Sequence, residues 1–143
     1  DLAWTEHVQM NIEDKNRFYS EIFRALKPGG RLVFHDVFQG QEGEVHFPVP
    51  WADEASISFL DSPDGVSQLL STVGFSSQSW ANTTDISKNW FQAALERMKD
   101  EGPLPLGLHV LMGDNAREKF GNMLRNLQED RIAVIQAVFL KPP

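Results

Sequence analysis

The chain has 143 residues and a mass of 16.2 kDa, enough for one domain with its own core but small for two. Its formal net charge of −7 argues against nucleic acid as a partner, because phosphate binding needs a basic surface. The absence of cysteine excludes disulfides and Cys-ligated zinc, and suits the cytoplasm. No apolar run approaches the ~20 residues that cross a bilayer, so a membrane is not an expected partner either.

The first predicted element is a helix from about residue 12 to the residues before Pro28. Its N-terminus can be capped by Asn11 or by the pair Glu13-Asp14. Residues 1–11 show no such pattern, and we expect them to form a frayed N-terminal segment. The apolar residues that recur at spacings of three and four are Ile12, Tyr19, Ile22, Phe23 and Leu26.

A strand is predicted next, over residues 31–36, after the Gly29-Gly30 turn. Its apolar residues are consecutive, which is typical of a strand buried on both faces and hence of a parallel α/β sheet. Residues 37–61 have no clear period and contain several glycines and prolines. Because such long connections are usually functional when they carry apolar residues, we expect a substrate-side loop here.

The remaining residues predict two strands and three helices. Ser62-Pro63 is typical of a helix start, and Gly74 of its end. A polar, weakly alternating segment over 75–84 indicates a strand near a sheet edge. Helices are expected over 87–99 and 116–128, with a Pro/Gly-rich connection at 102–113. The nearly all-apolar segment 131–140 predicts a central strand.

Several motifs give the chain a resemblance to class I S-adenosylmethionine-dependent methyltransferases. Leu26-Lys27-Pro28-Gly29-Gly30-Arg31-Leu32, with the strand that ends at Asp36, resembles the segment before the fifth strand of that fold. His7-Val8-x-Met10-Asn11-Ile12 and Phe47-Pro48-Val49-Pro50-Trp51-Ala52 resemble the sarcosine/dimethylglycine N-methyltransferase subgroup. Gln136-Ala137-Val138-Phe139-Leu140-Lys141-Pro142 resembles its closing strand.

The resemblance implies an α/β fold over a single domain, residues 1–143, that corresponds to the C-terminal half of a class I methyltransferase. We expect a truncated Rossmann-like fold: a small mixed sheet with the equivalents of strands five, six and seven, flanked by helices. The family binds S-adenosylmethionine with a glycine-rich turn that this sequence does not show. We therefore expect the chain alone to bind no cofactor.

The resemblance also implies roles for individual residues. His35 and Asp36 end a strand at the edge where α/β sheets gather ligands, so they are candidate catalytic residues that place the acceptor or take a proton from it. The alternative is that Asp36 caps the following loop and His35 packs on the strand. His7 and Asn11 are candidate substrate-binding residues that follow the position of strand four.

Further candidates are weaker. Phe47 and Trp51 of the long loop could line the substrate pocket, and Trp4 and His7 could contact the cofactor in the complete fold. The alternatives are simple packing of the loop and fraying of the N-terminus. The four histidines show no ligand spacing, so no metal site is expected.

Two functions are compatible with this sequence. The first is the C-terminal part of a methyltransferase that acts on a small acceptor such as an amine. This part would be inactive without its cofactor-binding half. The second is a free-standing dimeric binding or assembly module. Without strands one to four, the apolar strand containing Leu32–Phe34 would expose its edge, so we expect a homodimer through that edge or a missing N-terminal methyltransferase half as the partner.

Overall fold

The computed structural model describes residues 1–102 and 106–143, which fall into two compact units. Unit 1 consists of Asp1–Gln39, Phe59–Thr83 and Ala133–Pro143. Unit 2 consists of Gly40–Ser58 and Thr84–Ile132. Within the described ranges, no helix is both long enough and apolar enough to span a membrane.

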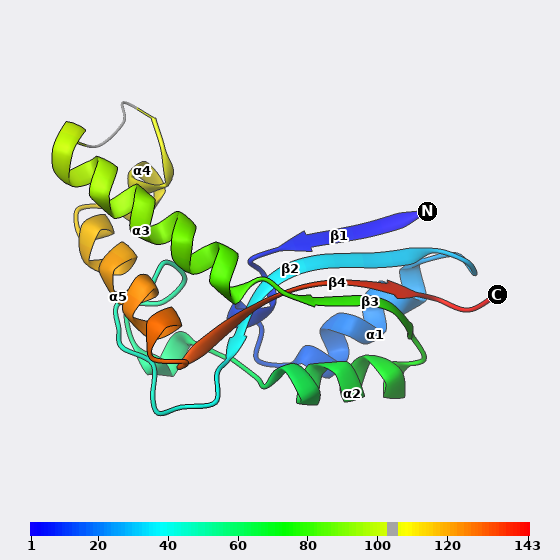
Figure 1. The fold of residues 1–143 in the computed structure, drawn as a ribbon. Helices are drawn as coiled ribbons and strands as arrows, with labels where there is room; N and C mark the ends of the chain where they lie inside the picture. The colour runs from blue at the N-terminus through cyan, green and yellow to red at the C-terminus, as the bar shows by residue number, and fades with distance from the viewer. Residues whose placement is uncertain (103–105) are drawn as a thin grey trace. The chain divides into compact units, whose positions relative to one another are not determined.

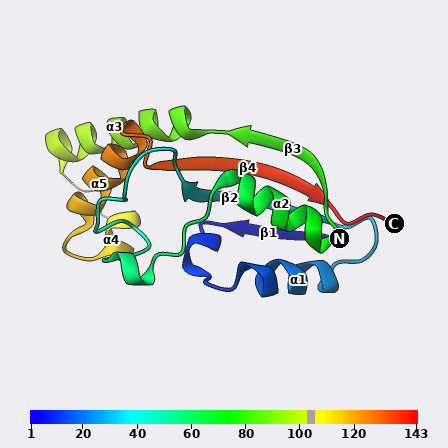
Figure 2. The same ribbon diagram turned by 90° about the horizontal axis from the view of Figure 1, so that it is seen from below.

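Unit 1 is built on a four-stranded sheet with the strand order β1-β2-β4-β3 (Figure 1). The strands are β1 (Leu2–Glu6), β2 (Arg31–Gln39), β3 (Ser76–Asn82) and β4 (Ile132–Leu140). β1 pairs with β2 in parallel, β3 pairs with β4 antiparallel, and Figure 2 shows β4 running against the other three strands. The predicted mixed sheet is confirmed, with the apolar β4 in a central place and the polar β3 at an edge.

The structure differs from the sequence-based expectation at the N-terminus. Residues 1–11, expected to fray, contain β1 and a short 3-10 turn over Gln9–Asn11. β1 has alternate residues exposed, so it lacks the consecutive apolar pattern of a buried strand. β1 is held in the sheet by its backbone hydrogen bonds to β2. The Asp1 carboxylate adds a further contact, since it accepts from the backbone N–H of Lys27 at 3.3 Å. The apolar strand expected to be exposed is therefore flanked by β1 and β4.

Two helices, α1 (Lys15–Ala25) and α2 (Pro63–Val73), cover one face of this sheet (Figures 1 and 2). Asp14 caps α1 by accepting from the N–H of Arg17, and Ser62 caps α2, as two of the sequence signals predicted. Gly74 ends α2 at a φ of 115°, which a side chain would disfavour. The core between sheet and helices consists of Tyr19, Leu26, Leu32, Phe34, Phe38, Val66, Leu70, Phe75, Ile135, Ala137 and Phe139.

Unit 2 contains helices α3 (Thr84–Glu101), α4 (Leu108–Met112) and α5 (Ala116–Gln128). α3 and α5 pack through aromatic side chains, with the ring centroids of Phe91 and Phe120 5.4 Å apart and those of Trp90 and Phe120 6.2 Å apart. α4 was not predicted, since it lies in the segment 102–113 that its prolines and glycines marked as a connection. Positions 103–105 of that segment lie outside the described residues.

The long loop of unit 2 is hydrogen-bonded to α5. The buried Asn126 side chain accepts from the backbone N–H of His46 at 2.8 Å and donates to its carbonyl at 3.0 Å. Asn122 donates to the carbonyl of Pro48 at 2.9 Å, and Lys119 pairs with Asp53 at 2.9 Å. Within unit 2, residues 40–58 are therefore a docked loop, and residues 37–39 of the predicted loop belong to β2.

Candidate functional site

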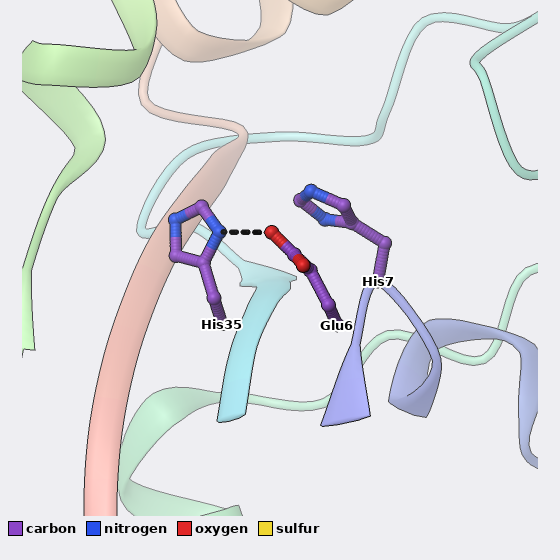
Figure 3. Close-up of side chains that lie close together, drawn as sticks. All are labelled: Glu6, His7 and His35. Carbon is purple, nitrogen blue, oxygen red and sulfur yellow. Dashed lines mark ion pairs between the residues drawn. The ribbon is translucent and has the colours of Figure 1, made fainter. Parts of the chain in front are cut away.

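The carboxyl ends of β1 and β2 bring Glu6, His7 and His35 together in unit 1 (Figure 3). The parallel register pairs Glu6 with His35, so the two side chains lie on the same face of the sheet. His35 Nδ1 lies 3.8 Å from Glu6 Oε1, and the imidazole centroids of His7 and His35 are 5.2 Å apart. The face is the one opposite α1 and α2, because the neighbouring Phe34 points into the core beneath those helices.

An unusual backbone conformation places His7 beside Glu6. Consecutive residues of a strand point to opposite faces, but His7 has a φ of 53°, in the left-handed region that non-glycine residues rarely adopt. Its N–H donates to the carbonyl of His35 at 3.0 Å, which fixes the turn against β2. A residue held in this way costs on the order of 1–3 kcal/mol, and such strain is concentrated at functional sites.

Asp36 lies on the other face of β2 from His35 and holds this turn from beneath. Its Oδ1 accepts from the backbone N–H of Val8 at 2.6 Å and of Gln9 at 3.3 Å. The carboxyl group is fully buried, and burial raises its pKa to about 6 while the two N–H groups oppose that change. These contacts are made to the turn after β1 and not to the loop that follows Asp36, and they make Asp36 a positioning residue for His7.

Thr83 sets the orientation of the His35 ring. The Thr83 hydroxyl donates to the carbonyl of Val134 at 3.2 Å, which uses its single proton. The 3.3 Å contact between His35 Nε2 and Thr83 Oγ1 therefore needs Nε2–H as the donor. In this tautomer Nδ1 presents its lone pair toward Glu6. Partial burial and then the neighbouring His35 lower the pKa of His7, which favours its neutral form.

The other predicted site residues are distributed over both units. Trp4 is 69% exposed on the same sheet face as Glu6. Asn11 is exposed in the turn and donates to the carbonyl of His7 at 3.4 Å. Phe47 and Trp51 belong to unit 2, where both are half-buried and Trp51 Nε1 donates to Ser58 Oγ at 2.9 Å.

Sequence reasoning missed Glu6 because it assigned no strand to residues 1–11. Glu6 directly precedes His7, and only the parallel register of β1 with β2 brings it opposite His35. The histidines are 28 positions apart, so no local spacing could reveal the cluster. Glu6 could have been identified only by predicting that residues 2–6 form a strand that pairs with β2.

Gly40 is not placed to form a glycine cradle for S-adenosylmethionine. Gly40 directly follows the carboxyl end of β2, where a cofactor turn could stand, but an added Cβ there would lie 2.1 Å from the carbonyl oxygen of Asp130. Gly40 is thus required by close backbone packing within unit 2, with its N–H donating to the carbonyl of Arg131 at 2.8 Å.

Comparison with known proteins finds similarity to methyltransferases. The family described as "Methyltransferase domain" matches residues 1–34. The dimethylglycine N-methyltransferase of Parasynechococcus marenigrum (strain WH8102) is 28% identical over 86 residues, which are 60% of this chain and 31% of the relative. The sarcosine/dimethylglycine N-methyltransferase of Halorhodospira halochloris is 24% identical over 105 residues, 73% of this chain and 38% of the relative.

The fold is also similar to that of solved methyltransferases. A phosphoethanolamine N-methyltransferase 2 of Haemonchus contortus, solved with phosphomonomethylethanolamine and S-adenosylhomocysteine, superposes with a TM-score of 0.78 at 18% identity. The match covers 100% of this chain and 34% of the nematode protein. The chain thus spans about a third of the length of the relatives that it matches.

Proposed function

Because the chain is similar to class I S-adenosylmethionine-dependent methyltransferases and spans part of their fold, we propose that it forms the acceptor side of an enzyme that methylates a small amine. The observation that carries the proposal is the convergence of Glu6, His7 and His35 at the carboxyl ends of two parallel strands. Ligands of open α/β sheets gather at that edge. The names of the relatives supply the class of acceptor, a small amine that also bears an anionic group.

His35 is the candidate proton acceptor of the site. An amine can accept a methyl group only through a free lone pair, so its ammonium proton must first leave. His35 Nδ1 carries a lone pair in the tautomer that Thr83 selects, and it faces the open side of the sheet. Glu6 Oε1, 3.8 Å away, would stabilise the imidazolium that forms. Asp36 would act indirectly, by holding the turn that carries His7.

The substrate side of the proposal uses the exposed residues around the histidines. Asn11 and His7 would orient the acceptor, and Trp4 would contact the cofactor held by another part of the enzyme. Phe47 and Trp51 of unit 2 stay predicted substrate-binding residues. The apolar, half-buried character of both residues supports that role.

We further propose that the cofactor-binding half of a methyltransferase occupies the outer edge of β1. β1 is the terminal strand of the sheet, and on this face Leu2 is 59% and Trp4 69% exposed. An edge strand with exposed apolar side chains offers unpaired backbone groups and apolar area to another strand. A second copy of this chain is the competing occupant, and the oligomeric state measured by light scattering distinguishes the two. A stable homodimer would replace the present proposal.

The proposed function is tested by joining the chain to the N-terminal part of a related methyltransferase. The N-terminal part of the Parasynechococcus dimethylglycine N-methyltransferase is fused before Asp1, and transfer of labelled methyl groups to sarcosine, dimethylglycine and phosphoethanolamine is measured. We expect transfer to at least one amine by the fusion and none by the N-terminal part alone. The matched control, His35→Gln in the fusion, should lower the rate at least about 10²-fold, as loss of a general base does.

The isolated chain gives the complementary test. In calorimetry with S-adenosylhomocysteine we expect no binding tighter than about 100 μM, equivalent to roughly 5–6 kcal/mol. Tighter binding would show that the cofactor site lies within these residues. A folded fusion that binds the cofactor but methylates none of the amines would overturn the proposed acceptor class.

A further inference from the structure

We propose that Glu6, His7 and His35 form a binding site for a divalent transition-metal ion of the zinc class (Figure 3). Each residue offers one ligand atom, and these atoms all lie within 4.8 Å of one another. The proposal does not depend on methyl transfer, since it rests on the geometry of the three side chains alone. It also differs from the expectation drawn from histidine spacing, because the fold joins ligands that are distant in sequence.

The backbone holds the three ligands in place before any ion binds. Glu6 and His35 are opposite one another in the β1–β2 ladder, so their Cα atoms are fixed by the sheet. His7 is fixed by its left-handed backbone, by its N–H bond to the carbonyl of His35, and by Asp36, which accepts from the next two N–H groups. Side chains on such a rigid frame lose little freedom on binding an ion, which favours affinity.

The hydrogen bond from His35 Nε2 to Thr83 is the kind of outer contact that metal-bound histidines make. A ligating imidazole usually donates its second N–H to a carboxylate, carbonyl or water, which fixes the tautomer and directs the other nitrogen at the metal. Here the Thr83 hydroxyl accepts at 3.3 Å and is itself held by the carbonyl of Val134. Nδ1 of His35 is therefore the nitrogen directed at Glu6.

The gap between His35 and Glu6 suits a cation. In the tautomer that Thr83 selects, His35 Nδ1 and the Glu6 carboxylate oxygen are both acceptors, so a cation between them would satisfy both. Their separation of 3.8 Å is too long for a hydrogen bond. It is within the roughly 4.2 Å that two metal–ligand bonds of about 2.0–2.2 Å can span.

The donor set selects the class of ion. Two neutral imidazoles and one carboxylate suit zinc and related first-row ions, whereas calcium and magnesium prefer oxygen ligands alone. Three protein ligands leave at least one position for water or for an anionic group of a small molecule. The location on the open face of the sheet, with Glu6 and His7 exposed, leaves that position accessible.

The proposal is tested by titrating Zn²⁺ into the metal-stripped chain in a non-coordinating buffer. We expect saturable binding of one equivalent, weakened at least tenfold in each of the variants Glu6→Gln, His7→Asn and His35→Gln. Asn is chosen at position 7 because it tolerates a left-handed backbone. Thr83→Val should weaken binding about tenfold through the His35 ring. His46→Asn, at a histidine that pairs with Glu129 in unit 2, is the matched control and should bind like the parent chain.

A second readout needs no variant. In the ¹⁵N spectrum of the imidazoles, one equivalent of Zn²⁺ should shift the resonances of His7 and His35 and leave those of His46 and His109 in place. The proposal is overturned if no saturable binding occurs, or if the ion shifts His46 or His109 instead. It is equally overturned if His35 and Glu6 respond only to protons, as a simple ion pair would.

Discussion

Among the described residues there are two histidine–carboxylate pairs, one in each unit, and their surroundings differ. In unit 2, His46 Nε2 lies 2.9 Å from Glu129, whose carboxylate also binds Arg125 at 2.7 Å and Arg131 at 2.6 Å. In unit 1, His35 Nδ1 lies 3.8 Å from Glu6, and the neighbouring group is a second imidazole rather than a guanidinium. The Glu129 carboxylate contacts two guanidinium groups and an imidazole. The Glu6 carboxylate lies opposite His35 Nδ1, which is itself an acceptor in the tautomer that Thr83 selects.

The difference distinguishes a structural ion pair in unit 2 from the ligand site that we propose in unit 1. The Glu129 carboxylate is paired with two guanidinium groups and an imidazole, and the network holds the long loop against α5. At the ends of β1 and β2 the backbone is fastened equally well, but the side-chain atoms meet without a hydrogen bond between them. Rigid backbone with incompletely paired side chains is the arrangement expected of a binding site.

The largest loss of stability is expected in unit 2, at the hydrogen bonds between the Asn126 side chain and the backbone of His46. Asn126→Ala removes both hydrogen bonds to the His46 backbone and leaves a buried donor and acceptor without their partner. The free energy of unfolding should fall by about 2–4 kcal/mol, measured by urea denaturation. Asn122→Ala, which loses one bond to the Pro48 carbonyl, is the matched control and should cost about 1 kcal/mol. Equal losses would mean that Asn126 does not hold the loop.

A smaller loss is expected at Asp36 in unit 1. Asp36→Ala leaves the N–H groups of Val8 and Gln9 without their acceptor, which costs about 1–3 kcal/mol. Removal of a fully buried carboxylate offsets part of that cost, so the net loss should be below that of Asn126→Ala. Hydrogen exchange should accelerate at Val8 and Gln9. Asp36→Asn keeps one acceptor oxygen and should protect both amides, and unprotected amides there would contradict this role.

The pH dependence of stability distinguishes the two carboxylates further. Hydrogen bonds from Arg125, His46 and Arg131 hold the pKa of Glu129 at about 2, below its ordinary value of 4.5. A lowered pKa means that the stabilisation is present above pH 4.5 and is lost as the pH falls from 4.5 toward 2. In Glu129→Gln the melting temperature should therefore depend less on pH in that window.

The control for this pH profile is Glu21→Gln. Arg24 alone lowers the pKa of Glu21, at an exposed position on α1, so the profile should change less than in Glu129→Gln. A parent-like profile for Glu129→Gln between pH 4.5 and 2 would show that the network does not stabilise the folded state.

The sequence predicted those elements whose signals are local. Ser62-Pro63 and Gly74 marked α2 because an N-cap, a first-turn proline and a left-handed glycine each act within one turn. The apolar run of β4 predicted its central position, because only a strand covered on both sides can consist of such residues. α5 was predicted over 116–128 and observed over the same residues.

What the sequence did not predict depends on long-range contacts. β1 exists through its ladder with a strand about 29 positions away, so its own alternating exposure gave no signal. The separation of His35 from Asp36 follows from alternation on β2, which predicts opposite faces but not which face carries the site. Glu6 and the left-handed His7 could be recognised only after β1 was in place.

The smallest change in stability is expected for a substitution of Trp4. In our proposal this residue lies where unit 1 contacts the cofactor-binding half. Trp4 is 69% exposed, so Trp4→Lys should change the free energy of unfolding by no more than about 0.5 kcal/mol. The same substitution should weaken calorimetric binding of a separately supplied methyltransferase N-terminal part by about tenfold or more, because buried tryptophans are frequent interface hot spots. Trp90→Lys is the control, since its ring packs on Phe91 and Phe120: it should lower stability and leave that binding unchanged. If both variants bind equally well, the outer edge of β1 is not where the cofactor-binding half docks.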